Sequence, residues 1–365
     1  MIDLSKAGPQ AKPGIDTIQA YVPGKSGAKS GKIHKLSSNE SPFGPSLHAI
    51  AAYSQQANSS LALYPDGTSN VLKEAIATRY NLKAAQIVCG SGSDELLQLL
   101  AHAYLGVGDE AIYSQFGFLV YPIAIATNGA TAVIAPEHEY VANVGEILSR
   151  VTAHTKIVFL ANPNNPTGTY LSAREVKRLH QGLPAHVLLV LDAAYAEYVL
   201  ADDYDSGIAL VESSTNVVMT RTFSKIYGLA GLRLGWAYCP PQIADVLNRI
   251  RGPFNVSAPA IAAGAAAMKD DNFIQQAAVH NAKWVAWVTT EIEALGMKVT
   301  PSVGNFVLVH FVTAERAAAA DQFLSERGII IRKVDAYGLP QALRITIGSE
   351  DANRAVIKAL ADFRA

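Results

Sequence analysis

A single lysine, Lys225, ends the stretch TRTFSK and follows an apolar run at 216–220. An ordinary lysine has a pKa of about 10.4, so it is protonated at neutral pH and is a poor nucleophile. Burial and a nearby cation such as Arg233 would lower that pKa and free the amine for covalent chemistry. The small residues Gly228, Ala230 and Gly231 would let the loop pack close to the sheet edge. A solvated lysine at a strand end is the alternative for this residue taken alone.

Three other polar groups also follow apolar runs. The segment 91–95 follows QIVCG, NPNNPTG at 162–168 follows KIVFLA, and Asp192 ends HVLLVLD with Tyr195 three residues later. Ligands of open parallel sheets bind at the carboxyl ends of the strands, so we expect these groups and the lysine to converge. Each group has a structural alternative: a helix capped by Ser93, a turn-rich connector with two Asn-Pro steps, and a buried ion pair of Asp192.

One small molecule would use all of these groups together. Its phosphate would bind the backbone amides of 91–93 at the start of a helix. A cationic ring nitrogen would lie against Asp192, a phenolate oxygen against Asn165 and Tyr195, and an aldehyde would react with Lys225. Pyridoxal 5'-phosphate has these features, and its chemistry needs both a lysine and an acidic partner for the ring nitrogen. We therefore expect this cofactor, and we expect no metal site.

Short β-rich runs alternate with helical patterns in the part of the chain that must position these groups. The expected strands cover 86–90, 109–114, 131–136, 156–163, 186–195 and 216–225. Their continuous apolar character predicts burial on both faces, and the alternation with helices predicts a parallel sheet with right-handed crossovers. A further strand, RLGWAYCP at 233–240, follows too closely for a crossover helix and could run antiparallel to its neighbours.

The length of 365 residues suits two domains. The segment 1–45 is rich in Gly, Pro, Ser and Lys and is expected to be an arm that joins the small domain as a lid. The segment 46–255 is expected to form a large cofactor-binding domain. The segment 256–365, with a long Ala-rich helical region at 258–296 and later strands, is expected to supply an interdomain helix and the small domain. The predicted fold class is therefore α/β, with a mostly parallel sheet sandwiched by helices and a smaller α+β domain.

The composition excludes several classes of protein. Half of the residues are hydrophobic, and the formal net charge of −1 argues against a non-specific nucleic-acid binder. The apolar stretches are too short to span a bilayer, and the first 14 residues contain no apolar run of signal-peptide length. Cys89 and Cys239 lie in apolar runs and are expected to be buried thiols, as suits a reducing cytosol. We expect a cytoplasmic protein with neither a membrane nor a nucleic-acid partner.

Over essentially its whole length the sequence resembles the fold-type I aminotransferases that depend on pyridoxal phosphate, and among them the branch that acts on histidinol phosphate. The motifs that carry the resemblance occur in the order and spacing of that family. They are GIDTIQAYVPGKS (14–26), SSNESPFGPS (37–46), LYPDG (63–67), NPNNPTG (162–168), LDAAYAEY (191–198), RTFSKIYGLAGLRLG (221–235) and LRITIG (343–348).

The resemblance implies a role for each candidate residue at the cofactor. Lys225 would bind the cofactor aldehyde and later shuttle the Cα proton. Asp192 would pair with the pyridine nitrogen, and both Asn165 and Tyr195 would contact the 3-oxygen of the ring. Phe116 would stack on the ring, although many relatives carry tyrosine at that position. The cofactor phosphate would be held by Gly92, Ser93, Thr222, Ser224 and Arg233, together with Tyr64 from the other subunit of a homodimer with shared active sites.

The resemblance also implies the substrates. Arg344 resembles the family's substrate-carboxylate arginine, and Arg332 and Tyr21 resemble its helpers. The implied reaction converts L-histidinol phosphate and 2-oxoglutarate into imidazole acetol phosphate and L-glutamate. Phe254 departs from the branch, in which a tyrosine hydroxyl would assist the substrate phosphate. The alternatives are an aromatic amino acid aminotransferase, a decarboxylase with the same cofactor, and an idle aminotransferase-like binding domain, against which the intact lysine and carboxylate argue.

Overall fold

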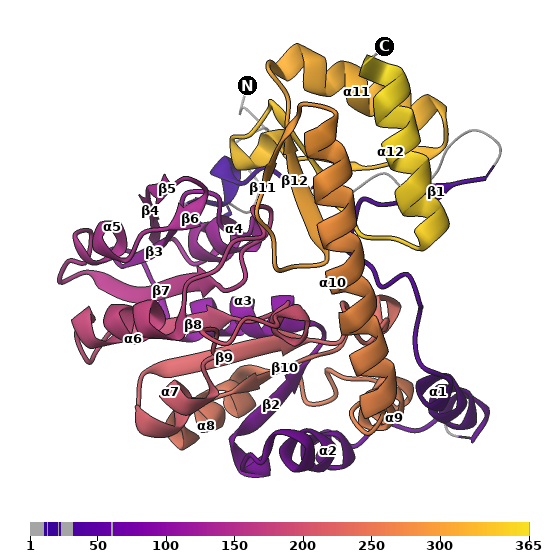
Figure 1. Ribbon diagram of the computed structural model, residues 1–365. Coiled ribbons are helices and arrows are strands. Elements are labelled where there is room, and N and C mark those ends of the chain that lie inside the picture. The colour runs from indigo at the N-terminus through magenta and orange to yellow at the C-terminus, as the bar shows by residue number, and fades with distance from the viewer. Residues whose placement is uncertain (1–10, 13, 21, 23–31, 60, 365) are drawn as a thin grey trace, which may run out of the picture.

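A seven-stranded sheet forms the centre of the molecule, and helices cover both of its faces (Figure 1). The computed structural model describes residues 11–12, 14–20, 22, 32–59 and 61–364. The strand order across the sheet is β2-β10-β9-β8-β7-β3-β4. The bounds are β2 Ile87–Gly90, β10 Gly235–Tyr238, β9 Val217–Thr222, β8 Leu188–Asp192, β7 Thr155–Ala161, β3 Glu110–Ser114 and β4 Thr131–Ala135.

The pairing within this sheet confirms the mostly parallel arrangement expected from the sequence. All pairs from β9 to β4 are parallel. β10 runs antiparallel to both of its neighbours, β2 and β9, because the connection from β9 is too short for a crossover. Successive residues of one strand enter different cores: Val88 packs on one face of the sheet and Cys89 on the other. This burial on both faces explains why the strands are continuous apolar runs.

Two groups of helices supply the partners for these faces. Residues of α3 (Ser93–Tyr104), α4 (Val120–Thr127) and α8 (Pro241–Ile250) share one core with the sheet. The opposite face packs against α2 (Asn70–Tyr80), α5 (Val144–Leu148), α6 (Ala173–Gly182), α7 (Ile208–Ser213) and α9 (Ala258–Ala267). α1 (Leu47–Ser59) lies outside these layers and packs on α9 (Figure 1). The short strands β5 (Glu137–His138) and β6 (Val141–Ala142) form a hairpin.

A second, antiparallel sheet with the order β11-β12-β15-β14 lies beside the first. Its strands are β11 Lys298–Thr300, β12 Phe306–His310, β15 Ala342–Thr346 and β14 Arg332–Lys333. The helices α10 (Asp271–Ala294), α11 (Ala314–Glu326) and α12 (Glu350–Arg364) share its core. The N-terminal segment joins this part of the molecule, because β1 (His34–Lys35) pairs in parallel with β13 (Ile329–Ile330). Five short 3-10 helices complete the described elements: η2 Ile15–Thr17, η3 Ala84–Gln86, η4 Ala196–Tyr198, η5 Ala230–Leu232 and η6 Asp335–Tyr337.

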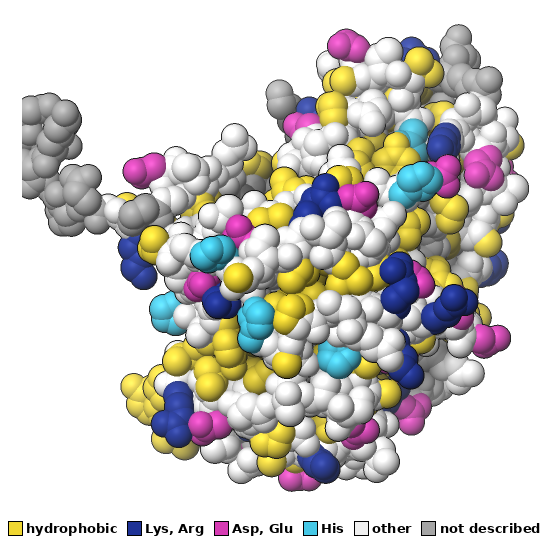
Figure 2. All heavy atoms as spheres, turned by 90° about the vertical axis from the view of Figure 1, so that its left-hand side faces the viewer, with side chains coloured by type: hydrophobic (Ala, Val, Ile, Leu, Met, Phe, Trp, Pro, Cys, Tyr) yellow, Lys and Arg dark blue, Asp and Glu magenta, His cyan; other side chains and the backbone are white. Residues whose placement is uncertain are grey.

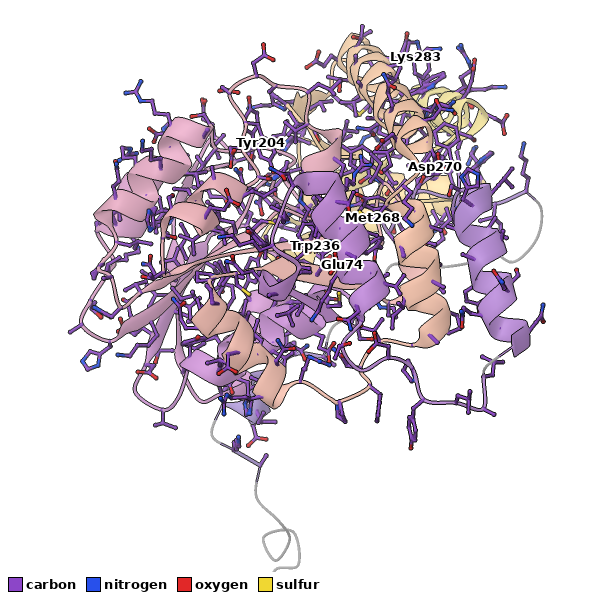
Figure 3. All side chains as sticks on the ribbon, turned by 90° about the horizontal axis from the view of Figure 1, so that it is seen from below. Glu74, Tyr204, Trp236, Met268, Asp270 and Lys283 are labelled. Atoms are coloured by element: carbon purple, nitrogen blue, oxygen red, sulfur yellow. The ribbon has the colours of Figure 1, made fainter. Side chains whose placement is uncertain are left out.

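The long helical region expected at 258–296 is two helices. The break falls between Met268 and Asp270, which lie at the junction of α9 and α10 (Figure 3). Asp270 caps α10 by accepting a hydrogen bond from the backbone N–H of Phe273 at 3.2 Å. α9 and the start of α10 pack in the core of the large sheet, whereas Trp284 and the residues after it pack in the core of the small sheet. This packing favours a domain boundary within α10 rather than at 255, and the division into domains itself stays a prediction.

The surface carries charges of both signs. On the face of the molecule where α5 and α6 lie, the Lys, Arg, Asp, Glu and His side chains of the described residues are interspersed among uncharged ones (Figure 2). None of the described helices combines the length and the apolar character that crossing a membrane requires.

Candidate active site

A cavity of about 250 Å³ lies at the carboxyl ends of β7, β8 and β9 and at the start of α3. The small sheet contributes side chains from β14 and β15 to the same cavity. The structure thus brings together groups that lie up to 307 positions apart in the chain, as Ser37 and Arg344 do. Ten of the residues singled out from the sequence line it: Ser93, Asn165, Asp192, Tyr195, Thr222, Ser224, Lys225, Arg233, Arg332 and Arg344.

Lys225 follows β9 and points its amine into this cavity. The amine Nζ donates a hydrogen bond to the carbonyl oxygen of Ser38 at 3.2 Å. Burial lowers the pKa of Lys225 to about 8, and the guanidinium groups of Arg344 and, less strongly, Arg233 act in the same direction. A shift of this size leaves roughly two orders of magnitude more free amine at neutral pH than an ordinary lysine has. The arginine that matters more for this amine is therefore Arg344, not the Arg233 chosen from the sequence.

The loop after the lysine packs closely, as its small residues suggested, but only one of them is required. A Cβ atom at Gly228 would lie 2.0 Å from the carbonyl oxygen of Gly44, and the φ angle of Gly228 is +68°. At Gly231 a Cβ atom would meet nothing within 4 Å. Gly228 therefore allows the lysine loop to contact the end of the N-terminal arm.

Asp192 ends β8 and is only 5% exposed. The hydroxyl groups of Tyr121 and Thr220 donate hydrogen bonds to its two carboxylate oxygens, at 2.9 and 3.3 Å. Burial nevertheless raises the pKa of Asp192 to about 6. Among the described residues, no Lys, Arg or His side chain forms an ion pair with it. The backbone N–H of Ala194 also favours the ionised form. A buried carboxylate that neutral donors stabilise, without a cationic partner among the described residues, is a suitable partner for a cationic N–H group of a ligand.

The start of α3 forms a cup with the donors that a phosphate needs. Gly92 precedes the helix with a φ of +82°, and a Cβ atom there would lie 2.5 Å from Nη2 of Arg233. Nη1 of Arg233 donates to the hydroxyl of Ser224 at 3.1 Å, and Nη2 lies 3.3 Å from a carboxylate oxygen of Asp94. The hydroxyl of Thr222 accepts from the backbone N–H of Ser224 at 3.1 Å. Helix-end amides, a guanidinium group and two hydroxyls make a donor set that suits a phosphate.

Asn165 and Tyr195 lie where the two sheets meet. The phenol oxygen of Tyr195 accepts a hydrogen bond from Nδ2 of Asn39 at 2.8 Å. Asn39 in turn bonds to the small sheet, because the hydroxyl of Thr346 donates to its Oδ1 at 3.0 Å and accepts from its backbone N–H at 2.9 Å. Oδ1 of Asn165 accepts from Nη1 of Arg344. Both residues are therefore fixed by partners from the N-terminal or C-terminal part of the chain.

Two arginines of the small sheet form a second cationic group in the cavity, apart from Arg233. Arg344 on β15 is 5% exposed and donates from Nη2 to the carbonyl oxygen of Ser37 at 2.8 Å. Arg332 pairs with it across strands β14 and β15, and its Nη2 donates to the carbonyl oxygen of Val22 at 2.8 Å. The cavity therefore offers two cationic groups that could each bind an anion, Arg233 at the start of α3 and the pair Arg332 and Arg344 on the small sheet.

Known proteins share both this sequence and this geometry. The model of the family described as aminotransferase class I and II matches residues 31–360. The chain belongs to this aminotransferase family. Histidinol-phosphate aminotransferases from Nitrobacter hamburgensis and from Rhodopseudomonas palustris strain BisB18 are 56% and 57% identical to the chain over 361 residues, which cover 98% of the chain and 99% of each relative.

A solved structure supports the same assignment. The crystal structure of the histidinol-phosphate aminotransferase from Sinorhizobium meliloti in complex with pyridoxal-5'-phosphate matches with a TM-score of 0.89 and 29% identity, over 99% of both chains. The resemblance drawn from the sequence motifs, and the fold class that it implied, are confirmed.

The cavity of this aminotransferase is lined by a different phenylalanine from the one expected to stack on the cofactor, and the stacking role of Phe116 stays a prediction. Phe118 lines the cavity, whereas Phe116 packs against Tyr140, with the ring centroids 5.7 Å apart, beside a cluster that includes Tyr337 of η6. The two phenylalanines flank Gly117 in the turn after β3. Sequence spacing alone does not distinguish them.

Tyr64 and Phe254 lie away from the cavity, and Tyr21 lies outside the described residues. Tyr64 is 82% exposed and stacks on Phe254 with the ring centroids 4.5 Å apart, and neither residue lines the cavity of its own chain. The role of Tyr21 as a helper of Arg344 therefore stays a prediction.

Several residues of the site were not singled out individually from the sequence. The segment 37–40 lines the cavity and provides hydrogen-bond partners for Lys225, Tyr195 and Arg344. Its motif, SSNESPFGPS, was available as a signal, but only as part of the family resemblance. Tyr121 and Thr220, which hold the carboxylate of Asp192, carried no signal in the sequence beyond their polar groups in apolar runs.

Proposed function

We propose that the protein is a transaminase that depends on pyridoxal 5'-phosphate and interconverts L-histidinol phosphate plus 2-oxoglutarate with imidazole acetol phosphate plus L-glutamate, a step of histidine biosynthesis. The observation that carries this proposal is the presence of two anion sites in one cavity with Lys225. Arg233 suits the cofactor phosphate, while Arg332 and Arg344 suit either the phosphate of the donor or a carboxylate of glutamate. The names of the relatives with 56–57% identity support the same substrate.

The residues present fit the cofactor. The cup at the start of α3 would hold its phosphate, Asn165 and Tyr195 would bind its ring oxygen, and Phe118 would cover one face of its ring. When bound, the cofactor supplies an electron sink beside the Cα atom of the donor. Asp192 would hold a proton at the ring nitrogen, since a buried carboxylate gains most from a cationic partner.

Lys225 would act twice in this scheme. Its neutral amine would bind the cofactor aldehyde and, once displaced by the donor amine, would take the proton from Cα. A pKa of about 8 places the amine close to the working pH, which allows it both to accept and to release that proton. The hydrogen bond from Nζ to the carbonyl oxygen of Ser38 keeps the amine on the cavity side of the loop.

A homodimer would complete the site. Large apolar side chains are exposed around α1 and the loop after it, among them Leu47 at 82%, Leu61 at 72% and Leu63 at 71%. Tyr64 and Phe254 belong to the same region of the chain surface. Exposed apolar clusters of this kind are typical of an interface with another protein. We infer that a second copy covers this surface and that Tyr64 of each copy reaches the cofactor phosphate of the other.

The cellular location follows from the chemistry and from the cysteines. Cys89 and Cys239 are both free and buried, and burial raises the pKa of each thiol to about 12. Unpaired thiols are usual in a reducing compartment. Together with the biosynthetic reaction, they support a cytoplasmic enzyme.

The direct test is a panel of amino donors with 2-oxoglutarate. Histidinol phosphate should give a higher kcat/KM than phenylalanine or tyrosine. Removing a charge-assisted contact costs about ten- to over a hundredfold in kcat/KM, so Arg332→Ala should reduce turnover of histidinol phosphate by that factor and affect phenylalanine less. Arg344→Ala should impair both half-reactions, because glutamate also needs this guanidinium.

One alternative has a specific observation in its favour. Phe254 has no hydroxyl and stacks on Tyr64, so in a dimer it would accompany Tyr64 towards the partner's cavity as an apolar side chain. Such a contact would suit an aromatic amino acid donor. If phenylalanine or tyrosine gives the higher kcat/KM, the enzyme is an aromatic amino acid aminotransferase instead.

A further inference from the structure

Three carboxylates line the cavity: Asp94, Asp192 and Glu40. Asp192 is buried beneath the position proposed for the ring nitrogen, and Asp94 pairs with Arg233 in the phosphate cup at 3.3 Å. Glu40 belongs to neither group. Its Oε1 accepts a hydrogen bond from Nζ of Lys35 at 2.7 Å, and its Oε2 makes no hydrogen bond with any described residue. A carboxylate in an active site with one oxygen available can bind a ligand N–H group.

The backbone contacts of the segment 37–40 fix the position of Glu40 relative to Arg344, which belongs to the second cationic group of the cavity. Along 37–40, the carbonyl of Ser37 accepts from Arg344, the carbonyl of Ser38 accepts from Lys225, and Glu40 follows two residues later. Three residues of extended chain span at most about 10 Å. Arg344 and Glu40 also act on the pKa of Lys225 in opposite directions, which places both charges within range of Nζ.

The amine of Lys225 therefore has a cation, Arg344, and an anion, Glu40, within electrostatic range. A donor that reaches Lys225 with its amine-bearing carbon can hold an anionic end at Arg344 and a hydrogen-bond donor at Glu40. Histidinol phosphate has this polarity, with a phosphate at one end and an imidazole ring at the other. Phenylalanine lacks any N–H or O–H group on its ring.

We propose that Glu40 is a specificity-determining residue whose carboxylate accepts a hydrogen bond from the imidazole ring of the donor. The proposal rests on the function proposed above and deepens it, because it explains how the pocket prefers imidazole to phenyl. A site that hydrogen-bonds a polar group discriminates strongly against an analogue that lacks the group. Glu40 thus contributes to the choice of the donor and not to proton transfer.

The test compares two donors, histidinol phosphate and phenylalanine, with the complete enzyme loaded with cofactor. Glu40→Ala should lower kcat/KM for histidinol phosphate by about ten- to a hundredfold and change it for phenylalanine by no more than about threefold. Glu40→Gln keeps an acceptor oxygen and should restore part of the loss. The ratio of the two donors is the readout, because any effect of Glu40 on the pKa of Lys225 applies to both donors and cancels.

Lys35→Ala is the matched control, since it removes the other half of the ion pair without touching the cavity lining. It should leave the donor ratio near that of the wild-type enzyme. Equal losses for both donors in Glu40→Ala, or the same change of ratio in Lys35→Ala, would overturn the role of Glu40 and leave the proposed function standing. A wild-type enzyme that does not turn over histidinol phosphate would overturn both proposals.

Discussion

Replacing Asp192 by asparagine should have opposite effects on the stability of the cofactor-free protein and on catalysis. Burial raises the pKa of Asp192 from 3.8 to about 6 in the cavity. Because the folded-state pKa is raised, the native state favours the protonated carboxyl group. The unfolding free energy of the cofactor-free protein is therefore highest below about pH 4, falls as the pH rises through about 6, and stays lower above that.

The size of the change in unfolding free energy follows from the pKa shift of Asp192. About two pKa units correspond to about 3 kcal/mol of unfolding free energy that the ionised carboxylate costs when it has no cationic partner. Asparagine has the same shape, keeps one acceptor oxygen and carries no charge, so Asp192→Asn should recover up to that amount at about pH 8. With an unfolding entropy of about 2.1 cal/mol/K per residue over 365 residues, the gain is about 4 °C in Tm.

The assay is thermal unfolding of the cofactor-free wild type and variant at several pH values. The difference in Tm should be positive at about pH 8 and should vanish towards pH 4. Tyr121→Phe is the reverse control, because it removes a hydrogen bond that favours the ionised carboxylate and should lower Tm at high pH. With cofactor bound, Asp192→Asn should slow turnover by orders of magnitude. A variant that is destabilised equally at every pH, or that turns over normally, would show that Asp192 is a structural residue.

Three further outcomes test the rest of the site. Lys225→Ala should abolish nearly all turnover, and borohydride treatment of the wild-type enzyme should attach the cofactor to a peptide that contains Lys225; label on another lysine contradicts the assignment. Phe118→Leu should weaken cofactor binding, measured by fluorescence titration, while Phe116→Leu should not, and the opposite ranking would restore the choice made from the sequence. Mixing inactive Lys225→Ala and Tyr64→Ala subunits should restore part of the activity, since one of the two sites in the heterodimer is then wild type; proven heterodimers without activity would place Tyr64 in its own subunit's site.

The gathering of the site's polar groups at one cavity was predictable because it depends on local rules, while their roles at the cofactor stay predictions. Each of these polar groups stands at the end of an apolar strand, and the carboxyl ends of parallel strands meet at one edge of the sheet. Asp192, Lys225 and the helix start at Gly92 were found in this way, and the structure places all three around one cavity or at its edge. The antiparallel course of β10 followed from the length of a single connection.

Other features of the site and of the fold depend on contacts between distant parts of the chain, which no local sequence pattern encodes. The segment 37–40 reaches the cavity because β1 pairs with β13, almost three hundred residues away in sequence. Phe118 rather than Phe116 lines the cavity, and the contact of Phe116 with Tyr140 joins residues too far apart in sequence for a local pattern to predict. The break between α9 and α10 depends on a cap at Asp270 inside a region whose composition is helical throughout.

Asn165 connects the part of the cavity formed by the large sheet to the part formed by the small sheet. Its Oδ1 accepts from Nη1 of Arg344 on the small sheet, and its Nδ2 lies 3.5 Å from the hydroxyl of Tyr337. In the arrangement proposed above, Nδ2 would donate to the ring oxygen of the cofactor. One amide would therefore link the guanidinium proposed for the substrate anion to the cofactor. Aspartate at this position would keep the contact to Arg344 but would have no proton to donate to the ring oxygen, and serine would be too short to serve both partners. A requirement for a donor and an acceptor at a fixed spacing would account for the amide of Asn165 in NPNNPTG.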